Sequence, residues 1–419
     1  IDEGLVLAGH DISAGGMVTT LLEMCFANTT GGIDVNLDKF QNTDLIKVLF
    51  AENPGVVIQV ADTDSARVKK ILEDAGVGYL KIGVPQVHRS LTVHRDGRTF
   101  DFDIDEMRDA WYETSYLLDR RQSFNGKAEE RRDNLGRQPV EILFGDDFTG
   151  KLSQYGLNPD RREASGIRAA VIREKGTNSE REMAYAFWLA GFDVKDVTMT
   201  DLITGRETLD DVNVIAFCGG FSNSDVLGSA KGWAGAFLYN PKAKAALDNF
   251  YARKDTLSLG VCNGCQLMAE LELLYPEHEL KHKLVHNESQ KFESTFVTLE
   301  IPHNDSIMLG NLAGSKIGVW CAHGEGRFSL PYEEKAYHVV AKYEYDGYPA
   351  NPNGSPHRIA GLCSADGRHL TMMPHPERSI FPWQCGYYPE SQRHEHQVTP
   401  WMQAFRNAYE WIAKQVKNG

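Results

Sequence analysis

The sequence predicts an α/β protein whose C-terminal part is built on a doubly wound parallel sheet, preceded by a smaller α/β domain. Two observations predict this fold class. From residue 166 onward, short apolar runs alternate with stretches whose apolar residues recur at helical spacing. A polar stretch over 122–165, rich in Gly, Asp, Arg and Asn, separates that part from an N-terminal part with its own strands and helices. Ligands of parallel sheets gather at the carboxyl ends of the strands, so functional residues are expected there.

Residues 1–105 are predicted to form the smaller domain. Its short apolar runs alternate with longer amphipathic stretches. The expected elements are strands over 5–8, 55–60 and 78–84, helices over 17–27 and 63–75, and a hairpin over 91–103 that turns at 95–97.

Residues 106–165 are predicted to connect the domains, through a helix over 106–121 and the polar linker over 122–165. Residues 166–419 form the second domain. Its expected elements are strands over 167–172, 212–217 and 256–261, helices over 179–190 and 243–252, and a further strand that ends just before residue 375.

Composition excludes several classes of protein. The 44 basic and 58 acidic residues give a formal net charge of −14, and nucleic-acid binding would need a basic face. The seven scattered cysteines do not form the dense, even set of a secreted disulfide framework. We find no run long enough for a membrane span and no signal peptide. We therefore expect a cytoplasmic protein without nucleic-acid or membrane partners, and the start at Ile1 suggests a fragment of a longer chain.

Cys262 is the predicted nucleophile. It follows the apolar strand over 256–261, lies between Gly260 and Gly264, and precedes a helical pattern. This arrangement is typical of a nucleophile elbow, in which glycines permit a tight turn and the side chain at the apex leaves the sheet. The helix start beside the sulfur favours the thiolate. An alternative is a redox or zinc site at the C-x-x-C pair Cys262 and Cys265, although no second C-x-x-C pair exists to complete a zinc site.

A cysteine nucleophile needs a base and a group that orients the base. His375 and Glu377 follow another apolar strand and are two residues apart, so an extended backbone would point both to the same side. Backbone N–H groups of Gly219, Gly220 and Asn263 are the candidate oxyanion hole. Taken alone, the Gly-Gly pair would indicate only a tight turn.

These residues together resemble the class I glutamine amidotransferase family. Its G-x-C-x-G-x-Q signature is matched at Gly260, Cys262, Gly264 and Gln266, and its H-P-E motif at His375, Pro376 and Glu377. The resemblance implies a flavodoxin-like domain with a Cys-His-Glu triad that hydrolyses glutamine to glutamate and ammonia.

Longer stretches resemble the phosphoribosylformylglycinamidine synthase family. They lie at 218–228, 287–294 and 322–328, and the last makes His323 and Glu325 candidate glutamine contacts, with an ordinary surface loop as the alternative. Asn223-Ser224 and Lys291 depart from the family pattern, outside the triad. The resemblance implies an ATP-dependent ligase of purine biosynthesis that converts formylglycinamide ribonucleotide, glutamine and ATP to the formylglycinamidine ribonucleotide.

The segment over 9–17 resembles a motif of the ATP-binding superfamily that includes aminoimidazole ribonucleotide synthetase, as does the whole N-terminal domain. The resemblance makes Asp11 a candidate Mg²⁺ ligand and Ser13 a candidate ATP contact; Ala14 departs from the motif, and a helix start capped by Ser13 is the alternative. Upstream synthetase domains would hold most of the ATP, Mg²⁺ and formylglycinamide ribonucleotide sites. Rival functions are the glutaminase of another synthetase, a C-x-x-C redox module and an inactive regulatory domain.

Overall fold

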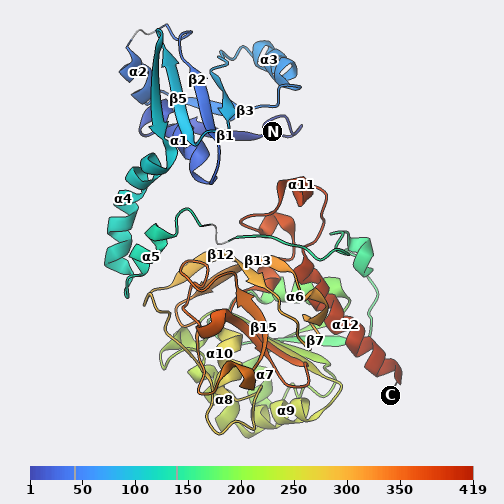
Figure 1. Ribbon diagram of the computed structural model, residues 1–419. Coiled ribbons are helices and arrows are strands. Elements are labelled where there is room, and N and C mark those ends of the chain that lie inside the picture. Colours follow the sequence, from blue (N-terminus) through green and yellow to red (C-terminus); the bar gives the residue numbers. More distant parts are fainter. Residues whose placement is uncertain (42–43, 138–139, 419) are drawn as a thin grey trace. The chain divides into compact units, whose positions relative to one another are not determined.

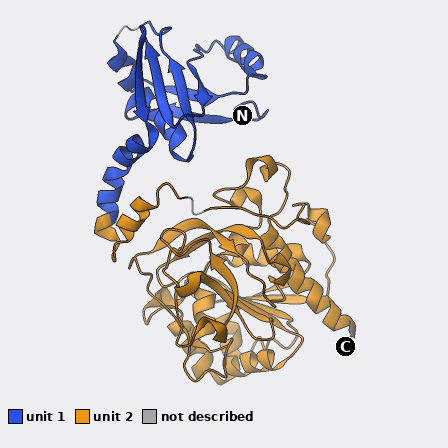
Figure 2. Ribbon diagram, in the orientation of Figure 1, with its two compact units in different colours: residues 1–119 blue, residues 120–419 orange. Residues whose placement is uncertain are grey.

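The computed structural model describes residues 1–41, 44–137 and 140–418. The chain divides into two compact units, Ile1–Asp119 and Arg120–Gly419 (Figure 2). The division falls inside the helix predicted over 106–121, and the domain boundaries at 105 and 165 stay predictions. Positions 138–139 of the predicted linker lie outside the described residues.

The first unit contains two small sheets and four helices among its described residues (Figure 1). Strand β1 (Ala8–Ile12) pairs antiparallel with β3 (Gly55–Gln59), and a four-stranded sheet has the order β4-β2-β5-β6. The strands of this sheet are β2 (Gly32–Asn36), β4 (Gly83–Gln86), β5 (Ser90–Arg95) and β6 (Arg98–Asp103). The helices are α1 (Gly16–Phe26), α2 (Leu45–Phe50), α3 (Ser65–Asp74) and α4 (Ile104–Gln122).

Two strand predictions in this unit are wrong in position. The strand predicted over 5–8 lies at Ala8–Ile12, and the one predicted over 78–84 lies at Gly83–Gln86. The residues at which β1 and β4 begin and end are those that form hydrogen bonds with β3 and β2, respectively. The apolar runs in the sequence do not coincide with these paired residues. The hairpin is confirmed: Arg95 pairs with Arg98, and Asp96 and Gly97 form the turn with φ of 49° and 72°.

The second unit is built on a mixed sheet of nine strands in its described part, in the order β13-β12-β15-β16-β17-β10-β9-β7-β8. Five neighbouring strands are parallel: β7 (Arg168–Arg173), β8 (Asp193–Thr198), β9 (Val214–Phe217), β10 (Leu257–Val261) and β17 (His369–Met372). The antiparallel strands are β12 (Glu293–Glu300), β13 (Lys316–His323), β15 (His338–Tyr343) and β16 (Ile359–Cys363). The α/β class is confirmed, and the parallel sheet has an antiparallel extension that the sequence did not predict.

Helices and short segments complete this unit. The α-helices are α5 (Lys127–Asp133), α6 (Glu180–Ala190), α7 (Met199–Thr204), α8 (Lys231–Tyr239), α9 (Pro241–Ala252), α10 (Asn263–Glu270), α11 (Glu390–Arg393) and α12 (Pro400–Asn418). The 3-10 helices are η1 (Leu152–Tyr155), η2 (Ser222–Asp225), η3 (Gly310–Leu312), η4 (Glu334–Ala336), η5 (Pro356–Arg358), η6 (Pro376–Arg378) and η7 (Pro382–Gln384), and β11 (Lys283–Val285) pairs with β14 (Arg327–Ser329).

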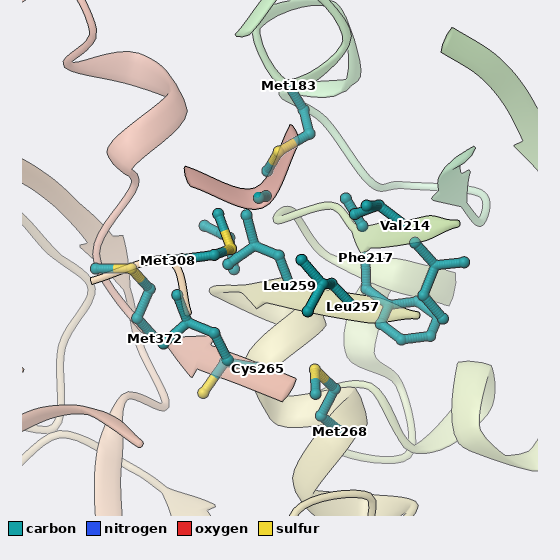
Figure 3. Close-up of a cluster of buried hydrophobic side chains, with 14 of the residues drawn as sticks. Met183, Val214, Phe217, Leu257, Leu259, Cys265, Met268, Met308 and Met372 are labelled. Carbon is teal, nitrogen blue, oxygen red and sulfur yellow. The ribbon is translucent and has the colours of Figure 1, made fainter. Parts of the chain in front are cut away.

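Strand β10 lies at the centre of the core. All five of its residues are buried, as expected for a parallel strand that is covered on both faces. Figure 3 shows Met183 of α6 and Met268 of α10 on opposite sides of Leu257 and Leu259 of this strand. Packing on both faces therefore fixes the end of β10, the position from which Cys262 projects. No helix in the described part of the chain has the length and apolarity that a bilayer crossing requires.

Candidate active site

Cys262 occupies a sharp bend between β10 and α10, with φ 54° and ψ −107°. Such angles are unfavourable for a residue with a side chain and cost about 1–3 kcal/mol. A side chain at either flanking glycine would clash with the backbone. A Cβ at Gly260 would lie 2.7 Å from the Gly264 carbonyl oxygen, and one at Gly264 would lie 2.1 Å from the Phe217 carbonyl oxygen. The bend predicted from the two glycines is therefore present, and its backbone is held by close packing.

His375 and Glu377 form a buried pair. His375 Nδ1 lies 2.7 Å from Glu377 Oε1, and the side chains are 2% and 0% exposed. Burial alone would lower the pKa of His375, but the Glu377 carboxylate and Cys262 together raise it. Burial raises the pKa of Glu377, but the charge of His375, its hydrogen bond and smaller contributions such as that of Arg378 together lower it below the ordinary value. The pair meets through the 3-10 turn η6 rather than through the extended backbone that we expected.

Gly219 lies where the thiol and the imidazole converge. A Cβ at this position would lie 2.7 Å from His375 Cε1 and 3.2 Å from Cys262 Cβ. His375 is also fixed through its backbone, whose N–H donates to the Trp320 carbonyl at 2.9 Å. Cys262 Sγ donates to the Ala322 carbonyl at 3.6 Å. The structure thus brings Cys262, His375 and Glu377 together around Gly219.

The three candidate oxyanion residues adjoin the bend. Gly220 has φ 116°, and a Cβ there would lie 2.6 Å from Thr177 Cα, so glycine is required. Asn263 is the first residue of α10. Its side-chain oxygen accepts from the Ser222 N–H at 3.0 Å and ties the Gly219-Gly220 loop to the nucleophile segment.

Of the candidate substrate contacts, Gln266 and Glu325 are joined by hydrogen bonds in a chain that begins at Asn263. Gln266 accepts from Asn263 Nδ2 at 2.8 Å and donates from Nε2 to the Glu325 carbonyl at 2.6 Å. His323 is 2% exposed, and burial lowers its pKa to about 4, with His375 acting in the same direction. His323 is therefore an interior, neutral imidazole, whereas the Glu325 side chain is 24% exposed.

Asp11 and Ser13 belong to the first unit, whereas Cys262 belongs to the second. Both are exposed, and the Asp11 carboxylate, 71% exposed, lies 3.5 Å from His10 Nδ1. The described residues contain no group of three or more His, Cys, Asp or Glu side chains that could hold a metal ion. Taken by themselves, they do not supply a complete Mg²⁺ site, which takes several oxygen ligands.

Cys265 is buried more completely than Cys262, which is 5% exposed. Cys265 is 0% exposed, and burial raises its pKa to about 12, so its thiol stays protonated. The cysteines of the chain are all free thiols. A dithiol redox site needs a reactive thiolate at each position in turn, so these surroundings disfavour the C-x-x-C interpretation.

Asp225 contacts the candidate site residue Asn263, and the sequence reasoning did not single it out. Its Oδ1 lies 3.4 Å from Asn263 Nδ2, beside the nucleophile. All three residues of the run Asn223-Ser224-Asp225 have positive φ, a turn conformation that Asn and Asp tolerate. No local sequence signal marks the contact with Asn263.

Two family models match this chain. The model of the CobB/CobQ-like glutamine amidotransferase domain matches residues 166–412. The chain belongs to this family. The amidotransferase domain thus contains the bend at Cys262, the His375–Glu377 pair and the Gly219-Gly220 loop. A second model, the C-terminal domain of AIR synthase related proteins, matches residues 1–94. Both matches confirm the resemblances drawn from the motifs.

Curated relatives extend the similarity beyond the amidotransferase domain. Phosphoribosylformylglycinamidine synthase of Homo sapiens is 40% identical over 98% of this chain and 32% of its own length. The probable chloroplastic/mitochondrial enzyme of that name from Arabidopsis thaliana is 40% identical over 98% of this chain and 30% of its own length. The chain therefore spans about a third of these relatives. Among solved structures, PurLQS from Thermotoga maritima is 27% identical, with a TM-score of 0.44, over 60% of this chain and 99% of that chain.

Proposed function

We propose that this chain is the glutamine-hydrolysing part of a phosphoribosylformylglycinamidine synthase, with Cys262, His375 and Glu377 as its triad. The observation that carries the proposal is the convergence of the Cys262 side chain and the His375 ring at Gly219, with Glu377 Oε1 2.7 Å from Nδ1 of that ring. A buried carboxylate on Nδ1 leaves Nε2 to exchange a proton with the sulfur and the substrate.

Hydrolysis proceeds in two stages. The Cys262 thiolate attacks the side-chain amide carbon of glutamine, and backbone N–H groups near Gly219, Gly220 and Asn263 stabilise the oxyanion. Protonated His375 gives its proton to the departing ammonia, which leaves a glutamyl thioester. Neutral His375 then removes a proton from water, whose oxygen attacks the thioester and releases glutamate. The raised pKa of His375 suits the first proton transfer.

The released ammonia is the nitrogen donor for synthesis. ATP activates the formyl amide oxygen of formylglycinamide ribonucleotide, and ammonia displaces phosphate to give the amidine. We assign most of the ATP, Mg²⁺ and ribonucleotide contacts to upstream synthetase domains. Asp11 and Ser13 are proposed as a contribution of this chain to the nucleotide site, which needs further ligands from elsewhere. The similarity of residues 1–94 to AIR synthase related proteins supports this assignment over the glutaminase of another synthetase.

A glutamine-mimicking diazo-ketone tests the nucleophile. We expect peptide mass spectrometry of the full-length protein to find stoichiometric modification of Cys262 and none of Cys265, because the Cys265 thiol is buried and protonated. L-Glutamine should protect Cys262, and Cys265→Ser should be labelled like the wild type. Modification of Cys265, or loss of activity without modification of Cys262, would contradict the assignment.

A further inference from the structure

Helix α5 lies outside the residues that the amidotransferase family model matches, yet its first turn is bound to that domain. The Phe124 N–H donates to the Ser289 carbonyl at 3.0 Å, and Asn125 Nδ2 donates to the Glu288 carbonyl at 2.7 Å. Lys127, the first residue of α5, places its Nζ 2.9 Å from Glu288 Oε2. The start of this helix is therefore held on residues 288–289 by both backbone and side-chain contacts.

Asn287, next in the chain to this docking segment, holds the loop that joins β13 to β14. Asn287 is 0% exposed, its Nδ2 donates to the His323 carbonyl at 2.8 Å, and its Oδ1 accepts from the Gly326 N–H at 3.0 Å. Its own N–H donates to the Gly324 carbonyl at 2.9 Å. One buried residue thus fixes both ends of the loop, whose Glu325 carbonyl accepts a hydrogen bond from the helix that follows the nucleophile.

The Glu288 carboxylate bridges α5 and the residue that follows this loop. While Oε2 pairs with Lys127, Oε1 lies 3.3 Å from Arg327 Nη1. The Lys127 side chain is only 15% exposed. Burial lowers the pKa of Lys127, but Glu130 and Glu288 together raise it above its ordinary value, so the side chain is cationic. A Cβ at Gly354 would lie 2.4 Å from the Glu288 carboxyl carbon, so the carboxylate is also closely packed.

We infer that Lys127 is a positioning residue for glutamine hydrolysis, which acts through Glu288 to hold the loop over 323–327 in place. The inference rests on the proposed hydrolysis of glutamine at Cys262. A displacement of α5 moves Glu288 and the adjoining Asn287, and the loop moves with them, because hydrogen bonds and ion pairs connect these groups without a gap. The linker helix is therefore a control element of the glutaminase, although it lies outside the family domain.

Steady-state kinetics of the full-length protein test this role. We expect Lys127→Gln and Glu288→Gln each to raise KM for glutamine by about 3- to 30-fold, the range of coupling that such networks carry. The value of kcat should change by less than about twofold, because the triad is untouched. The double variant should lose no more than Glu288→Gln alone, since Lys127 acts through that carboxylate. Lys127→Arg keeps the charge and should restore the wild-type KM.

Hydrogen exchange measured without glutamine tests the inference separately from the chemistry. The Gly326 N–H is bonded to the buried Asn287 side chain, so the peptide that covers residues 323–328 should exchange slowly in the wild type. In Lys127→Gln this peptide should exchange faster, because the segment that carries Asn287 has lost its contact with the α5 side chain. Lys127→Arg should return the exchange rate to the wild-type value.

Controls separate this role from a general loss of structure. Lys335→Gln breaks an exposed ion pair of 2.7 Å with Glu333 in the same unit, and it should change neither KM nor the exchange rate. Synthesis from added ammonium salt should be unchanged in every variant. A wild-type KM in both Lys127→Gln and Glu288→Gln, additive losses in the double variant, or equal losses with ammonia would overturn the inference. Faster exchange in Lys127→Gln of a protein that does not hydrolyse glutamine would instead overturn the proposed function.

Discussion

Cys262→Ala is expected to abolish glutamine-dependent synthesis by the full-length protein, with a loss of about 10⁵-fold or more, because no other group in the site can form the thioester. Synthesis from added ammonium salt should continue at the wild-type rate, since ammonia bypasses the glutaminase. The bend at residue 262 already forces an unfavourable backbone conformation, and alanine is smaller than cysteine, so the fold should survive. Steady-state assays with either nitrogen source give the comparison.

Two variants control this result. Cys265→Ala removes a neighbouring thiol that is fully buried and should reduce stability rather than kcat. Cys262→Ser keeps the size of the side chain and replaces sulfur by a weaker nucleophile, so it should also lose glutamine-dependent synthesis. Loss of ammonia-dependent synthesis in Cys262→Ala would contradict the division of labour between the two parts of the enzyme.

Glu377→Gln is expected to lower kcat for glutamine hydrolysis by about 10²- to 10⁴-fold with little change in KM. The carboxylate keeps His375 protonated against the effect of burial, which by itself lowers the pKa of the imidazole. An amide has no charge to do this, so the pKa of His375 falls in the variant. The protonated form is then lost at lower pH, and the alkaline limb of the residual pH–rate profile should move to lower pH.

Glu410→Gln is a matched control for this change. Glu410 is half-exposed on α12 and pairs with Arg406 at 3.0 Å, far in sequence from the triad. Its replacement should leave kcat and the pH–rate profile unchanged. A Glu377→Gln variant with the wild-type kcat and alkaline limb would show that Glu377 does not act on His375.

The bend at Cys262 could be predicted because its signal is local. Gly260 and Gly264 flank the cysteine, and the apolar run before it is a central strand buried on both faces. His375 and Glu377 were identified for a similar reason, although the turn that joins them was expected to be extended. Asp225 was not singled out because its contact is with Asn263, a residue 38 positions away.

The antiparallel half of the large sheet could not be predicted in this way. Strands β12 and β13 pair along eight residues each, yet no Gly or Asn turn of a tight hairpin joins them, and residues 301–315 separate them. The predicted position of strand β1 was wrong because this strand is mostly exposed, so apolarity does not mark it. Its pairing with β3 sets where it begins and ends. Strand boundaries that depend on distant partners leave little trace in the local pattern.

Trapping the glutamyl thioester tests most directly whether Cys262 is the nucleophile. Rapid acid quenching during turnover with isotopically labelled glutamine, followed by peptide mass spectrometry, should find the glutamyl group on the peptide that contains Cys262. The adduct should be absent from Cys262→Ala and should accumulate in Glu377→Gln if deacylation is slowed. Continued hydrolysis of glutamine with a glutamyl group on another residue, or with none on Cys262 at any quench time, would contradict the proposed mechanism.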